Sequence, residues 1–127
     1  HRGLSGPAIL QISSYWQHGE SIKIDLLPDK AIRAEILDNR SSNKLLRNFL
    51  HDFFSERLTE RICELLGINR QLSQLSNKDI DKITAFIHNF EIRPNGSEGY
   101  KKAEVTKGGV DTKYLDSKSM MAKNVEG

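Results

Sequence analysis

The sequence of 127 residues has a single cysteine, Cys63, so it cannot form an internal disulfide. A single thiol fits a protein of the reducing cytoplasm, and this is the localisation we expect. Hydrophobic runs are only a few residues long, much shorter than a membrane-spanning helix requires. The first residues do not resemble a secretory signal. We therefore expect no membrane partner.

A strong excess of charge is also missing. The 19 basic residues are nearly balanced by 17 acidic ones, which gives a net charge of +2. The two signs are interleaved along the chain, a pattern typical of a solvated surface. Aromatic residues make up only 7% of the chain, which leaves few side chains for stacking on bases. We therefore expect no nucleic-acid partner.

The motifs of common catalytic and cofactor sites are absent as well. No GxGxxG or Walker loop is present, so this chain alone is not expected to hold a dinucleotide. The four histidines and Cys63 do not have the spacing of metal ligands, and the GLSGP segment lacks the second glycine of a nucleophile elbow. Cys63 follows Ile62 on an expected helix and is interpreted as a buried, inert thiol. No catalytic residue and no metal site are predicted.

The N-terminal region shows the pattern of a helix followed by a strand. Pro7 suits a first helical position, and Gly19 is expected to end a helix with one apolar stripe. Apolar and polar residues then alternate over 21–27, which predicts a half-buried strand that stops at Pro28. Residues 1–28 are therefore expected to form a helix plus a strand.

Residues 29–87 are predicted to form a helical insert. The expected caps of its helices are Asp29, Ser42 and Ser76, and Gly67 is an expected helix stop. Ser55 either starts a further helical turn or continues the helix before it. Apolar residues recur at helical spacing, in particular Leu46, Phe49 and Phe53 on one helix and Ile80, Ile83 and Ile87 on the last one. These faces are expected to form the core.

The period changes from helical to alternating near residue 88. Alternation over 88–94 and 100–106, on either side of Pro94-Asn95-Gly96, predicts a hairpin within 88–110, and the strand at 21–27 is a third candidate for the same sheet. Residues 111–127 are polar and weakly periodic and are expected to be a connection. The predicted fold class is α+β, with helices packed against a small antiparallel sheet.

Two parts of the sequence resemble the bacterial NAD(P)/FAD-dependent oxidoreductases related to aminoacetone-oxidase-like flavoproteins. The first part is HRGLSGPAILQIS with IKIDLLP, and the second, later in the chain, is AEVTKGGV with SMMAKNVEG. The resemblance implies that the chain is an internal fragment, whose partner is the missing FAD-binding domain of the same polypeptide. FAD is then the cofactor of the full-length parent, and none is expected in the fragment. Residues 111–127 would connect back to that domain.

The same resemblance implies a set of cofactor-binding candidates at the domain junction: His1, Gly3, Ser5, Gly6, Pro7, Thr106, Gly108 and Gly109. At 119–123 the chain reads SMMAK where members of the family read TMESK, and we assign no binding role to this segment. The leading hypothesis is therefore an accessory domain that covers the flavin and substrate cleft and is inactive alone. The alternative is a free-standing helical protein-interaction module.

Overall fold

The computed structural model describes residues 3–123, and the chain divides into two compact units. One unit is continuous and spans Ser21–Arg93, and we call it the helical unit. The other combines the two ends of the chain, His1–Glu20 and Pro94–Gly127, and we call it the terminal unit.

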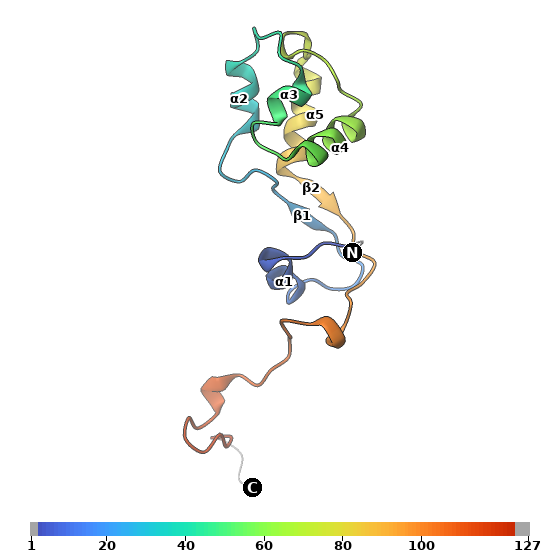
Figure 1. The fold of residues 1–127 in the computed structure, drawn as a ribbon. Coiled ribbons are helices and arrows are strands. Elements are labelled where there is room, and N and C mark those ends of the chain that lie inside the picture. The colour runs from blue at the N-terminus through green and yellow to red at the C-terminus, as the bar shows by residue number, and fades with distance from the viewer. Residues whose placement is uncertain (1–2, 124–127) are drawn as a thin grey trace. The chain divides into compact units, whose positions relative to one another are not determined.

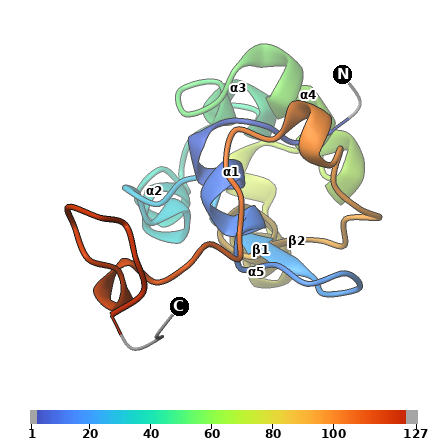
Figure 2. The same cartoon turned by 90° about the horizontal axis from the view of Figure 1, so that it is seen from below.

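The helical unit begins and ends with a strand and carries four helices between them (Figure 1). In chain order its elements are β1 (Ile22–Ile24), α2 (Ile32–Asp38), α3 (Leu46–Leu50), α4 (Glu56–Leu66), a 3-10 turn (Leu72–Gln74), α5 (Asn77–His88) and β2 (Phe90–Ile92). Figure 2 shows α2 and α4 on different sides of α5.

All the buried hydrophobic residues of the described chain lie in the helical unit. The α5 side chains Ile80, Ile83 and Ile87 are fully buried, as the sequence pattern predicts. They join a single cluster with ten further residues: Ile32, Ile36, Leu46, Phe49, Leu50, Ile62, Cys63, Ile68, Leu72 and Leu75. Each fully buried aliphatic side chain contributes about 1.5–3 kcal/mol through the area removed from water. This cluster stabilises the unit.

Caps and turns confirm part of the predicted helix limits. Ser76 and Asp79 form a capping box at the start of α5, and Gly67 ends α4 with a left-handed φ of 65°. Ser55 directly precedes α4, which also agrees with the prediction. The starts predicted at Asp29 and Ser42 are wrong, because α2 begins after Ala31 and α3 begins after Leu45. At α3 the reason is tertiary, because the N–H of Leu46 donates to the carbonyl of Arg70.

The sheet is a two-stranded antiparallel ribbon, which confirms the α+β class and the strands predicted near 21–27 and 88–94. Ile22 pairs with Ile92 and Ile24 pairs with Phe90, so the apolar residues of both strands share one face. The ribbon therefore closes a loop that contains every helix of the unit.

The strand predicted at 100–106, and with it the hairpin within 88–110, is wrong. Residues Tyr100–Lys102 form a 3-10 turn after Gly99, and no strand follows within the described residues. The apolar alternation of 103–106 contains only Ala103 and Val105, and the paired edge of β2 is already occupied by β1. A short segment with only two apolar residues has little hydrophobic surface to bury as a further strand.

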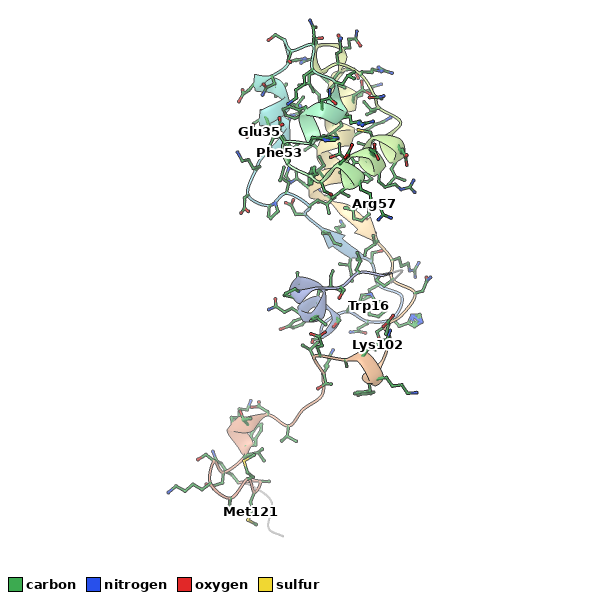
Figure 3. The ribbon with its side chains drawn as sticks, viewed as in Figure 1. Trp16, Glu35, Phe53, Arg57, Lys102 and Met121 are labelled. Carbon is green, nitrogen blue, oxygen red and sulfur yellow. The ribbon has the colours of Figure 1, made fainter. Side chains whose placement is uncertain are left out.

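The terminal unit contains α1 (Pro7–Ser13) and the 3-10 turns Tyr100–Lys102 and Thr112–Tyr114. Helix α1 ends six residues before the predicted stop at Gly19. The chain turns instead, and the indole of Trp16 donates a hydrogen bond to the carbonyl of Glu20. No described residue of this unit is buried, and Figure 3 shows the side chains of Lys102 and Met121 extending from the ribbon.

Candidate functional site

The first predicted site segment surrounds the start of α1. Gly6 precedes the helix with φ 103°, a conformation that favours glycine, and Pro7 is the first helical residue. Gly3 and Ser5 are exposed, and no side chain caps the helix. His1 lies outside the described residues. The segment is therefore an exposed turn followed by a short helix.

The second predicted segment contains Thr106, Gly108 and Gly109, and all three are exposed. Gly108 has φ 97°, which again favours glycine. Within residues 3–123, no hydrogen bond or ion pair joins this segment to residues 3–7. The structure therefore does not bring the two predicted halves of the site together through polar contacts.

The described residues do not fit the pyrophosphate of FAD. A Cβ atom placed on Gly6, Gly108 or Gly109 would meet no heavy atom within 4 Å, so these glycines are not required by a close approach inside the chain. Buried polar atoms without a partner, His51 Nε2 and Thr59 Oγ1, both lie in the other unit.

His88 and Asp25 form a pair that resembles part of a catalytic site. The distance from His88 Nδ1 to Asp25 Oδ1 is 2.9 Å, and the backbone N–H of Ile32 donates to His88 Nε2 at 3.3 Å. Nε2 is then an acceptor, so Nδ1 carries the proton and donates it to Asp25. Because both ring nitrogens are engaged, His88 joins the end of α5 to the segment before α2 and is not free to act as a base.

The pKa of Asp25 is lowered from its ordinary value. The main cause is the hydrogen bond donated by the backbone N–H of Leu27, and the contact with His88 adds to it. Both contacts favour the carboxylate form. Asp25 is therefore ionised under ordinary conditions and holds the turn between β1 and α2.

Cys63 is buried, as predicted, and burial raises the pKa of its thiol. It lines a shallow hollow of about 380 Å³ together with Arg47, Glu60, Glu64, Gly67 and Asn69. Arg47 Nη2 lies 3.4 Å from Glu60 Oε1, so the charge at this hollow is largely balanced. A protonated thiol next to a balanced ion pair is a poor nucleophile.

Other parts of the described chain offer no obvious reaction centre. Residues 3–123 contain no group of three or more metal-ligating side chains, and none of their helices is both long and hydrophobic enough to cross a bilayer. Leu46 and Phe49 are buried and Phe53 packs against the core, so the helix face of the alternative hypothesis is used internally.

Sequence reasoning missed one surface, at the end of the helical unit that lies away from the ribbon (Figure 1). Residues 39–45 and 69–78 lie side by side there, and neither segment contains an acidic residue. We call these two segments the polar end. Overall net charge did not indicate it, but a local count of acidic residues would have done so.

The fold and the sequence together define the class of protein. Residues 1–105 match the family described as HI0933-like protein barrel and H2TH domain, and the chain belongs to this family. The family is of the FAD-dependent oxidoreductase type, which confirms the resemblance at this level.

Two relatives carry a more specific name. The chain is 45% identical over 130 residues to the ribosomal RNA dihydrouridine synthase of Escherichia coli (strain K12). It is 44% identical over 131 residues to the ribosomal RNA dihydrouridine synthase of Haemophilus influenzae. Both alignments cover 100% of this chain and 32% of the relative, so the chain spans about a third of the length of these proteins.

Proposed function

We propose that this chain is an accessory part of a flavoprotein that reduces uridine in ribosomal RNA to dihydrouridine. The observation that carries the proposal is the 45% identity with a ribosomal RNA dihydrouridine synthase across the whole chain. The resemblance to flavoproteins did not indicate a substrate, and the proposal names one, ribosomal RNA. It also differs from our expectation of no nucleic-acid partner.

In this proposal FAD is bound by polypeptide outside the chain. A reduced flavin would supply the hydride for reduction of the uracil double bond, and NADH or NADPH would renew the reduced flavin. The residues of this chain have a different task, which is to cover the flavin and substrate cleft and exclude water. The reaction would take place in the cytoplasm.

The surface of the terminal unit supports this task. Among residues 3–123, nine of the exposed large hydrophobic side chains lie in the terminal unit and four in the helical unit. Those of the terminal unit are Leu4, Ile12, Tyr15, Tyr100, Val105, Val110, Tyr114, Met120 and Met121. Exposed apolar groups in such number are typical of a surface that another part of the protein covers. The predicted cofactor-binding residues would lie at the junction with the FAD-binding domain. They are Gly3, Ser5, Gly6 and Pro7 in one segment and Thr106, Gly108 and Gly109 in the other.

The test uses the whole protein that contains this chain. It is incubated with ribosomal RNA and NADPH or NADH, and the digested nucleosides are analysed by mass spectrometry. We expect dihydrouridine in the RNA. A protein that holds FAD and oxidises NADPH but leaves the uridines of ribosomal RNA unchanged would contradict the proposal.

A second measurement tests whether FAD is bound by polypeptide outside this chain. The 127-residue chain alone is titrated with FAD, and flavin fluorescence is followed. We expect no quenching at micromolar concentration, while the whole protein retains flavin. Tight binding of FAD by the chain alone would mean that the cofactor site lies within these residues.

A further inference from the structure

We infer that the polar end of the helical unit, residues 39–45 and 69–78, contacts the sugar–phosphate backbone of ribosomal RNA. The inference rests on the proposed function, because it names the surface by which such a protein would hold its substrate. It adds a binding surface that lies outside the flavin cleft.

The first argument is local charge. The polar end carries four basic side chains, Arg40, Lys44, Arg70 and Lys78, and no acidic residue. Elsewhere the signs are mixed, for example on α4, where Glu56, Glu60 and Glu64 alternate with arginines. A phosphate backbone is repelled by carboxylates, so RNA meets less repulsion at these two segments than at α4. The carboxylates nearest to the polar end, Asp52 and Asp79, are paired with its own Lys44 and Arg70.

The second argument is geometry. Two backbone hydrogen bonds join the two segments: Leu72 N–H to the Lys44 carbonyl at 3.0 Å and Ser73 N–H to the Ser42 carbonyl at 3.1 Å. Leu46, which follows the first segment, donates its N–H to the Arg70 carbonyl at 2.8 Å. Leu46 and Leu72 are themselves fully buried. The basic residues therefore stand on loops that are fixed to the core, which lowers the entropy cost of binding.

The third argument is that the cations are available. Within residues 3–123, neither Arg40 nor Lys78 has a carboxylate within 4 Å. Lys44 pairs with Asp52 at 2.6 Å and Arg70 pairs with Asp79 at 3.6 Å. Asp79 also accepts hydrogen bonds from the backbone and the hydroxyl of Ser76, so it stays paired when Arg70 turns to a phosphate. Exposed pairs of this kind hold their partners weakly.

The remaining side chains favour RNA over an acidic protein as the partner. The exposed neutral residues are amides and hydroxyls that bond phosphate and ribose oxygens: Asn39, Ser41, Asn43, Asn69, Ser73, Gln74, Ser76 and Asn77. The polar end contains no aromatic residue and only one exposed large hydrophobic, Leu45. Protein interfaces use aromatic and apolar anchors, and base recognition uses stacking. Neither is offered here, so contact with the backbone independent of sequence is the mode that fits.

The test compares two fourfold variants of the full 127-residue chain. One removes the basic residues of the polar end (R40Q, K44Q, R70Q and K78Q). The matched control removes the same charge from exposed positions elsewhere in the helical unit (K23Q, R57Q, R61Q and R93Q). Binding of a fluorescent ribosomal RNA transcript is measured by anisotropy at several salt concentrations. Far-ultraviolet circular dichroism and thermal melting establish that each variant is folded.

We expect the polar-end variant to bind roughly tenfold more weakly or worse, with the slope of log K against log salt reduced by about 3. The control variant should stay within about threefold of the unmodified chain. Equal losses in both variants would mean that total charge alone decides binding, and this would overturn the inference. Should the fourfold variant be unfolded, R40Q and K78Q are tested singly, and each should reduce the slope by about 1.

The whole protein separates the inference from the proposed function. If it forms dihydrouridine in ribosomal RNA and the polar-end variant does so equally well at limiting RNA, the inference fails and the function stands. If the unmodified protein forms none, the function itself fails. A variant impaired on intact ribosomal subunits but not on protein-free RNA would show contact with a ribosomal protein, which also overturns the inference.

Discussion

The helical unit and the terminal unit differ in composition and in their cores: all five phenylalanines lie in the helical unit, and eight of the nine glycines lie in the terminal unit. In the helical unit thirteen hydrophobic side chains are buried, whereas no described residue of the terminal unit is. The helical unit can therefore stabilise itself, and the terminal unit depends on contacts that it does not make internally.

The largest expected difference is in amide hydrogen exchange. Amides of α4 and α5 should exchange only on global unfolding, and those of α1 and of 100–116 should exchange by local opening close to the unprotected rate. The measurement is exchange of the 127-residue chain followed by mass spectrometry. Equal protection in both units would show that the terminal unit has a core of its own.

The next largest difference is expected in how much a core substitution lowers the free energy of unfolding in each unit. Ile83 is fully buried, so Ile83→Ala should lower the free energy of unfolding by about 2–5 kcal/mol in urea denaturation. Ile12, on α1, is 38% exposed. The substitution Ile12→Ala should therefore change the free energy of unfolding by less than about 0.5 kcal/mol. A cost for Ile12→Ala as large as that for Ile83→Ala would mean that the two units unfold as one.

Substitutions of glycines with positive φ should give a smaller difference in stability between the two units. Gly67 (φ 65°) ends α4, and Gly67→Ala should cost about 1–2 kcal/mol because an L-residue is strained there. Gly6 (φ 103°) is strained in the same way by substitution, but it belongs to the terminal unit. Gly6→Ala should therefore leave the urea midpoint of the helical unit unchanged, and a shift comparable to that of Gly67→Ala would contradict the comparison.

The smallest expected effect concerns pH. The pKa of Asp79 is lowered chiefly by hydrogen bonds from the side chain and backbone of Ser76. A folded pKa below the ordinary value of about 3.9 stabilises the native state above that value, and the stabilisation is lost as pH falls through the folded pKa. Melting temperature measured between neutral and acidic pH should therefore fall less steeply in Asp79→Asn, which starts from a lower stability. Asp111 of the terminal unit also has a lowered pKa, and Asp111→Asn serves as the control that leaves the profile unchanged.

Much of the helical unit could be predicted from sequence because its signals are local. The capping box at Ser76, the glycine stop at Gly67 and the isoleucines of α5 each depend on residues within one or two turns. The starts of α2 and α3 could not be predicted in this way. Leu46, for example, begins a helix because Arg70, far along the chain, accepts its N–H.

The predicted hairpin failed for a related reason. Alternation identified Phe90 and Ile92 as strand residues correctly, but it does not identify the partner strand, and the nearest candidate was not the one used. The predicted cofactor-binding residues stay a prediction. Gly6 and Gly108 adopt the positive φ that suits glycine, and within residues 3–123 no hydrogen bond joins their two segments.

The pairing of Ile22 with Ile92 has a consequence for how this region can be engineered. Because paired strands lie about 5 Å apart, the path of the chain leaves and returns at almost the same point. The segment between the two strands contains all the helices of the unit. A short β-turn between Ile24 and Phe90 could replace this segment without altering the pairing of Ile22 with Ile92. Shortened or exchanged versions of this segment would then test the proposed contact of its polar end with RNA, with the ribbon left intact.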